Sequence, residues 1–320
     1  MTAVYITIDT EYAAGFAGLG RVENFARSIA CETPSGPVGV FHQMRLLDRH
    51  GLKGVFFVDP MPALVWGRAA IEDIVGPIVA AGHDVQLHCH TEWLELAGAA
   101  NPFGATGQNI ADFAFDDQCA ILCWARDTLV AAGAPPPVAF RAGNYGASDD
   151  TLRALSAIGL QYDSSHTPGI DDGAGRISLT RRHRRPVEHC GVIEVPTGCI
   201  RGFGGRLRHA QVTAISAREM LAAIRHARDH SVSSFTLVSH SFELLCRARQ
   251  RANAIVHRRF EALCEGIAAM PGVTGATYAS RPPALTACVE IPRPILPASQ
   301  LRIALRMAEQ FVSNRLYGAR

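Results

Sequence analysis

Two histidines and a glutamate stand close together in the segment VQLHCHTEW, residues 85–93. In an extended chain His88 and His90 point the same way, whereas in a helical turn His88 and Glu92 do. Mixtures of histidine and carboxylate bind zinc, nickel or cobalt, and a catalytic site needs about three protein ligands with one position left for water. The segment therefore predicts a metal site and leaves open whether His90 or Glu92 belongs to it.

Two carboxylates near the N-terminus, Asp9 and Glu11, have the same spacing of two residues in the segment DTE. In an extended chain both side chains point to the same side. One carboxylate can then bind a metal ion while its neighbour exchanges a proton.

The elements that must position these residues alternate along the chain. Short β-rich runs are expected at 3–8, 52–58, 83–88, 137–140, 160–163, 233–239 and 272–278. Runs with helical spacing fall at 37–51, 69–82, 117–133, 148–159, 216–230 and 258–270. This order predicts an α/β fold with a parallel sheet, and about seven units favour a closed (β/α) barrel over an open sheet.

Ionisable side chains stand at the ends of six of these β-like runs. In parallel barrels the carboxyl ends of the strands carry the active site, because the loops there bring residues of different strands together. One polar strand end is usually a solvated terminus, but six of them predict a common site. The residues are Asp9, Asp59, His88, Arg141, Asp163 and His240.

The domain organisation predicted from composition is one barrel followed by a short appendage. Residues 1–283 form the expected barrel, with long loops at 98–112 and 164–187, and residues 284–320 form a proline-rich connector and a C-terminal helix from Gln300 to about Leu316. This helix is basic and amphipathic, so we expect it to pack on the barrel or on a second subunit of a homo-oligomer; attachment to a membrane surface is the alternative.

Composition excludes several classes of protein. The net charge of +2 is too small for a dedicated nucleic-acid binder. The first apolar run, AVYITI, is too short to span a membrane and has no features of a signal peptide, so a cytoplasmic protein without integral membrane segment is predicted. Nine cysteines without a CxxC pair indicate neither a disulfide framework nor a zinc ribbon.

Five segments in order, ITIDTEY, GHDVQLHCHTEW, FRAGNYG, YDSS and LVSHSFEL, resemble the motifs of the polysaccharide deacetylases, carbohydrate esterase family four with its NodB-homology domain. The resemblance extends from about residue 3 to about residue 280. It implies a deformed (β/α) barrel and metal-dependent hydrolysis of an acetamide, usually on an N-acetylated sugar.

The resemblance also implies roles for individual residues. Asp9 matches the general base and Glu11 the metal-binding carboxylate. His88 matches the first metal histidine and His240 the general acid. Arg141 matches the arginine that holds the base, for which a bidentate contact is expected, and Asp163 matches the aspartate of the fourth motif, expected near His240.

The chain departs from the family at the second metal histidine, which usually follows four residues after the first. That position is Glu92 here, with His90 as the nearer imidazole. We favour His90, because an extended HCH segment brings both rings together and imidazole suits zinc better than a second carboxylate. Glu92 is then a further ligand or a residue that orients an imidazole.

Two aromatic residues and two basic segments have less specific signals. Tyr145 is a candidate for stabilising an oxyanion, and Trp93 for contacting a sugar, although tryptophan more often packs in a core. The segments 181–186 and 201–209 are expected to be solvated loops; the alternative is a landing surface for an anionic glycan or a nucleotide-linked sugar phosphate.

Together these features predict a metal-dependent hydrolase that removes an N-acetyl group from a glycan or a sugar precursor. The expected cofactor is a divalent metal, first zinc, with nickel, cobalt or manganese as alternatives. A hydrolase of a small-molecule amide C–N bond on the same fold, and a carbohydrate-binding protein without activity, are the competing hypotheses.

Overall fold

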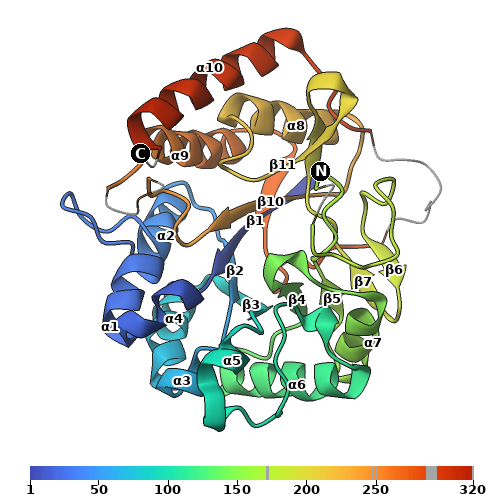
Figure 1. Cartoon of the computed structure of the whole chain (residues 1–320). Coiled ribbons are helices and arrows are strands. Elements are labelled where there is room, and N and C mark those ends of the chain that lie inside the picture. Colours follow the sequence, from blue (N-terminus) through green and yellow to red (C-terminus); the bar gives the residue numbers. More distant parts are fainter. Residues whose placement is uncertain (171–172, 247, 249–250, 286–293, 319–320) are drawn as a thin grey trace.

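A curled, mostly parallel sheet organises the chain in the computed structural model, which describes residues 1–170, 173–246, 248, 251–285 and 294–318 (Figure 1). Its strands follow the order β10-β1-β2-β3-β4-β5-β7-β6, and β11 also pairs with β1. All pairings are parallel except that of β6 with β7. The strands are β1 (Thr2–Thr10), β2 (Val55–Val58), β3 (Asp84–Cys89), β4 (Ala139–Ala142), β5 (Tyr162–Asp163), β6 (Val187–His189), β7 (Val192–Glu194), β10 (Ser234–His240) and β11 (Val273–Ala276).

The predicted α/β deformed barrel is confirmed, and the deformation lies in its closure. Among the described residues, β10 and β6 at the two ends of the strand order are not paired with each other. The strand β6 turns back on β7 as an antiparallel hairpin, with no crossover helix between them. Because a parallel barrel is closed by parallel neighbours, the hairpin ends the parallel part of the sheet at β7.

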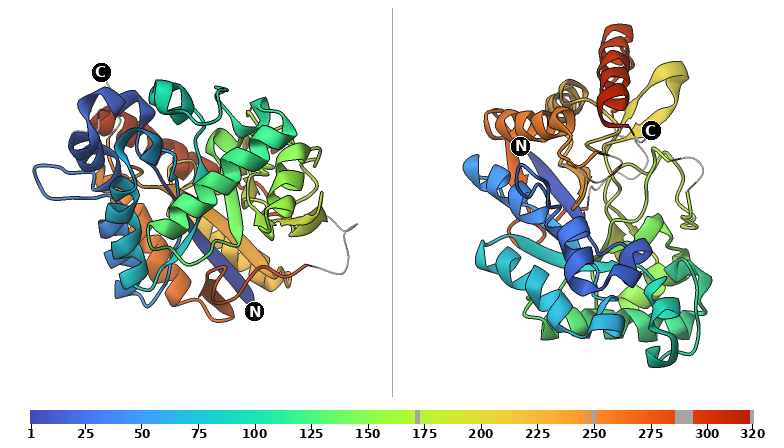
Figure 2. Two further views of the ribbon diagram at one scale, coloured as in Figure 1. Left: turned by 90° about the horizontal axis from the view of Figure 1, so that it is seen from below. Right: turned by 60° about the vertical axis from the view of Figure 1, so that its left-hand side comes forward.

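Helices cover the outer face of the sheet (Figures 1 and 2). The predicted crossover helices are all present, as α2 (Val40–Arg49), α4 (Ala69–Ala80), α6 (Phe115–Ala131), α7 (Asp149–Ala157), α8 (Ala217–Asp229) and α9 (Ala254–Ala268). Shorter pieces are α1 (Arg21–Asn24), α3 (Ala63–Trp66), α5 (Trp93–Ala97), the 3-10 turns Ala14–Leu19, Gly98–Ala100, Ile110–Asp112, Gly143–Tyr145 and Phe203–Gly205, and the π-helix Phe25–Ile29.

Side-chain caps explain where several helices begin. The Ser216 hydroxyl accepts a hydrogen bond from the Glu219 backbone N–H, and the Glu219 carboxylate accepts one from the Ser216 N–H, which caps α8 reciprocally. Helix α9 begins at Ala254, four residues before the predicted start, because the Asn253 side chain accepts hydrogen bonds from the N–H groups of Ile255 and Val256.

The core has two layers, one on each face of the sheet. The larger layer lies between the sheet and the helices. The smaller layer fills the barrel and is built around the ring of Tyr278, whose centroid lies 5.6 Å from that of Tyr5, 6.1 Å from that of Phe57 and 5.4 Å from that of Tyr162. This aromatic plug closes the barrel below the strand ends.

The predicted C-terminal helix is α10 (Gln300–Tyr317), which lies beside the antiparallel hairpin of β8 (Cys199–Arg201) and β9 (Leu207–His209) in both views (Figures 1 and 2). Residues 201–209 were expected to form a loop, and the structure corrects this: the strands β8 and β9 are too short for alternation to identify them in the sequence. Residues 181–186 do form a loop. The domain boundary at 283/284 stays a prediction, and residues 286–293 of the connector lie outside the described chain.

The outward side of α10 is apolar, whereas its inward side buries Ile303, Arg306 and Ser313. Its exposed apolar residues are Leu301, Leu305, Met307, Phe311, Val312 and Leu316. In the described parts of the chain, each helix is too short or too polar to cross a lipid bilayer.

Candidate metal and catalytic site

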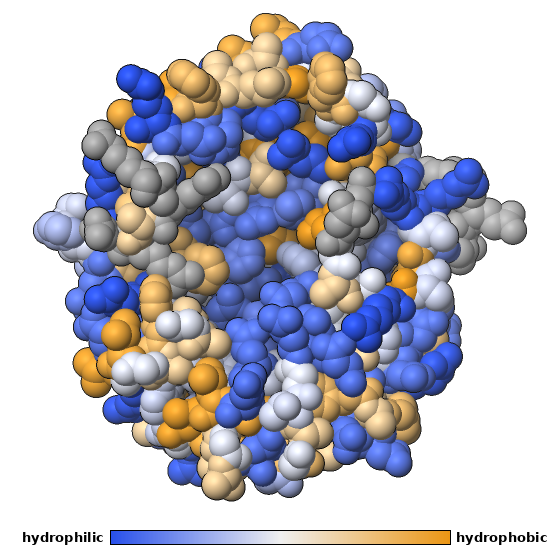
Figure 3. All heavy atoms as spheres, viewed as in Figure 1, coloured by the Kyte–Doolittle hydropathy of each residue, from blue (hydrophilic) through white to orange (hydrophobic). Residues whose placement is uncertain are grey.

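Four predicted residues meet because their strands end in register. Asp9 of β1 pairs with His240 of β10, and His88 of β3 pairs with Arg141 of β4. Parallel neighbours in register place their side chains on the same face of a sheet, here the inner face. The centre of this side of the molecule is hollowed and mainly hydrophilic (Figure 3). The strand ends thus build one polar site over the aromatic plug.

Three candidate metal ligands converge at this site. The Glu11 Oε2 atom lies 2.5 Å from His90 Nε2 and 3.2 Å from His88 Nε2, and all three ligand atoms fall within 4.8 Å of one another. His88 is buried, while Glu11 and His90 keep a small exposed fraction. The cluster is therefore reached from solvent through Glu11 and His90.

The hydrogen bonds of His88 show that this cluster fits a cation. Its Nδ1 atom lies 2.6 Å from the backbone carbonyl oxygen of Arg141, which only accepts hydrogen bonds, so Nδ1 carries the proton. Its other nitrogen, Nε2, points to the carboxylate of Glu11, where it can offer a lone pair to a cation held between them. Two imidazole nitrogens and one carboxylate form a known donor set for catalytic zinc, with a backbone carbonyl holding the first ring in place.

Glu92 lies on the other side of the His90 ring, away from the cluster. Its Oε2 atom is 3.6 Å from His90 Nδ1, and its side chain is one-third exposed. The residue immediately precedes α5, where the chain has already turned. The extended HCH segment has thus brought His88 and His90 together, as the sequence favoured, and Glu92 is placed where it can orient an imidazole.

Two residues without a predicted role position His90. The Asp59 carboxylate accepts hydrogen bonds from the backbone N–H groups of Met61 and His90, at 3.0 and 3.4 Å. A side chain at Gly143 would place its Cβ 2.8 Å from the His90 ring, so only glycine allows β4 to approach this closely. Asp59 stood out at its strand end, but nothing in the sequence connected Gly143 with His90.

A buried ion pair holds the candidate base. The Arg141 Nη1 atom donates hydrogen bonds to Asp9 Oδ1 at 2.6 Å and to the Thr7 hydroxyl at 2.8 Å. The other guanidinium nitrogens bind the carbonyl and hydroxyl oxygens of Ser164. The expected bidentate contact between Arg141 and Asp9 is therefore wrong, because the remaining donors of the guanidinium bind Ser164. As a result, Asp9 Oδ2 is left for other partners, with His240 Nε2 at 3.9 Å.

The candidate acid, His240, is held by a residue that sequence reasoning missed. The Nδ1 atom of His240 lies 2.6 Å from Glu243 Oε2. Glu243 is buried, and it accepts further hydrogen bonds from the Gln211 side chain and from the backbone N–H and hydroxyl of Thr213. Glu243 was visible in the segment LVSHSFEL, three residues after His240, but its spacing alone did not indicate a contact.

The charge around His240 keeps it protonated. Burial lowers its pKa, but the neighbouring carboxylates of Glu243, Asp9 and Glu11 outweigh burial and raise the pKa to about 9. For Glu243, burial raises the pKa, and the charge of His240 with the hydrogen bonds of Thr213 and Gln211 lowers it below its usual value. The pair is thus an imidazolium and a carboxylate at neutral pH, as a general acid requires.

Tyr145 occupies a strained position at the same edge. Both it and Asn144 have positive φ angles, 55° and 54°, which cost energy for residues other than glycine and are found mostly at functional sites. The Tyr145 hydroxyl is buried without a hydrogen-bond partner among the described residues. Burial and the charge of Asp9 raise its pKa, although Arg141 opposes this rise. The hydroxyl therefore stays protonated and can donate to an oxyanion.

Asp163 does not join His240, contrary to expectation. It pairs in register with Phe140, the residue before Arg141, so alternation places its side chain on the other face of the sheet. Its carboxylate accepts hydrogen bonds from the Ser165 backbone and hydroxyl. Burial and the neighbouring Asp163 raise the pKa of Glu194 well above its usual range.

Trp93 is fully buried, and its ring packs edge-on against Trp66 with centroids 5.0 Å apart. It offers no face to a substrate, which argues against the predicted sugar contact. Trp93 is the first residue of α5, and the inward side of that helix turn is part of the core.

Comparison with known proteins identifies the fold. No protein-family model matches the chain, and no curated protein matches it. Among solved structures, it matches a protein of Mycobacterium smegmatis assigned as a polysaccharide deacetylase, with a TM-score of 0.53 and 17% identity over 90% of this chain and 94% of that one. A protein of Pseudomonas aeruginosa PAO1 with the same assignment gives 0.53 and 12% over 88% and 92%. The chain has the fold of the polysaccharide deacetylases.

The same fold occurs in a protein of different activity. A 4-alpha-glucanotransferase from Thermococcus litoralis matches with a TM-score of 0.53 and 10% identity, over 87% of this chain and 39% of that one. The likeness therefore concerns the architecture, and the activity has to be argued from the residues at the strand ends.

The first prediction separates His90 from Glu92. His90→Ala removes a ligand atom, so we expect the purified protein to lose its bound metal. Glu92→Gln removes only a contact to the outer ring nitrogen, so the metal stays bound with an affinity at most on the order of 10- to 100-fold lower, and hydrolysis slows. Metal content per chain is measured by mass spectrometry after dialysis, with Glu95→Gln, at an exposed site in α5, as the matched control. Metal loss in Glu92→Gln but not in His90→Ala would show that the ligand is Glu92, four residues after His88 as in the family pattern.

The second prediction concerns Glu243. Because His240 must carry a proton to act as an acid, the rate should fall as the pH rises through its pKa of about 9. Glu243→Gln keeps a hydrogen-bond acceptor but removes the charge. The pH at which the rate falls on the alkaline side should therefore be lower by about one to three units. The exposed variant Glu265→Gln should leave the limb unchanged. An unchanged limb in Glu243→Gln shows that Glu243 does not set the protonation of His240.

Proposed function

We propose that the chain is a metal-dependent hydrolase that removes an N-acetyl group from a glycan or sugar precursor. The observation that carries this proposal is the meeting of three metal-ligand atoms, of Glu11, His88 and His90, with two proton-exchanging groups, Asp9 and His240, at one hollow edge of the sheet. The fold likeness to polysaccharide deacetylases supports it.

The residues of the chain divide the reaction between them. When bound at Glu11, His88 and His90, a divalent ion lowers the pKa of water and polarises a carbonyl group. Asp9, held in place by the guanidinium of Arg141, accepts the proton of the attacking water through its Oδ2 atom. His240, held protonated by Glu243, donates its proton to the nitrogen that leaves, and the products are acetate and an amine.

Two further groups act on the intermediate and on the base. In this proposal the Tyr145 hydroxyl, buried without a hydrogen-bond partner among the described residues, donates to the oxyanion that forms as water attacks. Thr7 and Ser164 bind the remaining donors of Arg141, so the guanidinium stays in position while Asp9 changes its protonation. Asp163 supports the strand end through Ser165 and exchanges no proton with the substrate in this proposal.

A metal site weakened by Glu92 in place of the second histidine would favour the competing small-amide hydrolase. His90 supplies the second imidazole instead, so the cluster has its three ligand atoms. A binding protein without activity does not need a buried arginine on one carboxylate and a buried glutamate on a histidine. Zinc as the metal and a cytoplasmic location stay predictions; the donor set of two histidines and one carboxylate suits zinc.

The third prediction tests the division of labour between the two carboxylates. Asp9→Asn should abolish acetate release from N-acetylglucosamine substrates while leaving metal content near that of the wild type, because asparagine cannot accept the proton. Glu11→Ala should lower the metal content. Thermal unfolding of both variants controls for the loss of the Asp9 charge beside Arg141. Equal metal loss in both variants would contradict the assignment, and ammonia release from small amides without acetate release would favour the competing hydrolase.

The fourth prediction concerns a homo-oligomer formed through α10, which we propose from its outward apolar residues. Phe311 is 68% and Met307 58% exposed on this helix. Burial of such side chains against a second copy is favourable by about 25 cal/mol for each Å² of apolar surface. We expect sedimentation velocity to show a dimer for the wild type and a monomer for Met307→Glu/Phe311→Glu. A monomeric wild type overturns this part of the proposal.

A further inference from the structure

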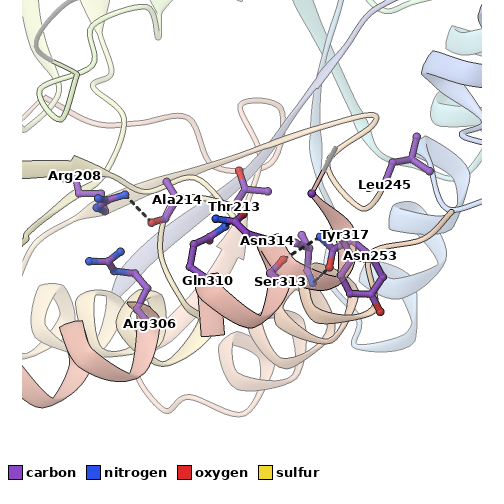
Figure 4. A pocket seen from close by; sticks show the side chains of 12 residues that line it. Arg208, Thr213, Ala214, Leu245, Asn253, Arg306, Gln310, Ser313, Asn314 and Tyr317 are labelled. Atoms are coloured by element: carbon purple, nitrogen blue, oxygen red, sulfur yellow. Dashed lines mark hydrogen bonds between the residues drawn. The ribbon is translucent and has the colours of Figure 1, made fainter. Parts of the chain in front are cut away.

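Two adjoining cavities lie beside α10, on the C-terminal side of the barrel. One, of about 460 Å³, is open to solvent and lies between α10, the segment 213–214 and the start of α9 (Figure 4). The other, of about 580 Å³, lies under the β8–β9 hairpin. Arg208 of β9 and Arg306 of α10 line both cavities. The two arginines therefore mark the place where the cavities meet.

The positive charge at this place is only partly neutralised. The Arg306 guanidinium is buried and contacts the carboxylate of Glu219 at 3.3 Å. Arg208 donates to the carbonyl oxygen of Ala214 at 3.2 Å and has no carboxylate partner among the described residues (Figure 4). Arg206 adds a third guanidinium to the wall of the second cavity. Among the described residues, Glu219 is thus the one carboxylate that acts on both Arg306 and Arg208.

The two central arginines also act on each other. Burial lowers the pKa of Arg208, the charge of Arg306 lowers it further, and only Glu219 opposes this. Like charges held together in a partly desolvated space repel strongly, and an anion between them removes the repulsion. Arginine is the side chain best suited to phosphate, because its planar fork makes two parallel charge-assisted hydrogen bonds.

We propose that Arg208 and Arg306 form an oxyanion-binding site that takes a phosphate group, with Arg206 at its entrance. Uncharged polar side chains complete the wall of the first cavity: Gln310, Ser313 and Asn314 on α10, and Thr213 opposite them. A cavity of this size accommodates a small polar ligand, and its neutral donors and acceptors can hold the rest of the ligand.

The position of the site connects it with the candidate acid. Thr213, in the wall of the first cavity, donates its backbone N–H to Glu243, which holds His240. His209, in the wall of the second cavity, contacts the Gln211 side chain at 2.5 Å, and Gln211 also donates to Glu243. The segment 209–213 is therefore shared between the two sites.

This proximity leads to a second step, which rests on the proposed function: the phosphate belongs to the substrate, an N-acetylated sugar that carries a phosphate ester. The basic hairpin, expected to be a solvated loop, then binds the anionic part of the substrate while the acetamide lies at the strand ends.

Binding alone tests the site, without any activity. Inorganic phosphate and pyrophosphate are titrated into the full chain by isothermal calorimetry. We expect Arg208→Gln to weaken binding by at least about tenfold, since it removes one charged fork, and the exposed variant Arg225→Gln on α8 to leave it unchanged. Arg306→Lys, which keeps the charge next to Glu219, should weaken binding less than Arg208→Gln. Equal affinity in the wild type and Arg208→Gln, or no binding at millimolar phosphate, overturns the site.

Kinetics tests whether the anion belongs to the substrate. Acetate release is compared for N-acetylglucosamine and its 1-phosphate in the wild type, Arg208→Gln and Arg225→Gln. We expect a higher kcat/KM for the phosphate ester than for the uncharged sugar, lost in Arg208→Gln through a higher KM and kept in Arg225→Gln. Phosphate binding without this preference overturns the second step and leaves a separate anion ligand. Phosphate binding without acetate release from any sugar overturns the proposed function and leaves the anion site standing.

Discussion

The buried contact of Arg141 with Asp9 is the interaction on which the site depends. The guanidinium is fully buried on the inner face of the sheet, 4.4 Å above the ring of Phe57. It binds β1 through Thr7 and Asp9 and the chain after β5 through Ser164. A buried charge is tolerated only when all its donors are satisfied, and removing one partner of such a pair costs about 3–5 kcal/mol. Several strand ends are therefore tied to one cation.

The two carboxylates of the DTE segment acquire different roles from their partners. Asp9 accepts a hydrogen bond from the guanidinium of Arg141 on one oxygen and keeps the other oxygen available. Glu11 faces two imidazoles, whose nitrogens can exchange protons for a metal ion. Although they stand only two residues apart, the neighbouring strands give them different partners, and the proposed division of roles rests on this difference.

The region beyond β10 adds features that the barrel alone does not have. Glu243 holds His240, and the segment 209–213 that supports Glu243 also lines cavities closed by α10. The acid is thus connected with a charged surface formed by residues almost one hundred positions apart in the chain. The solved structures with this fold include one assigned as a deacetylase and one of a glucanotransferase, so the fold alone does not determine the activity.

The sequence by itself determined the alternation of strands and helices and the strand-end positions of Asp9, His88, Arg141 and His240, because these depend on local periodicity. It favoured His90 over Glu92 as the partner of His88 without deciding between them. Helix starts could be found only within a few residues, as Asn253 shows for α9. Only the tertiary structure decided which face Asp163 takes, that Trp93 is buried, that Glu243 reaches His240, and that Arg208 meets Arg306. These depend on the register of neighbouring strands and on the packing of distant segments, for which spacing along the chain carries no signal.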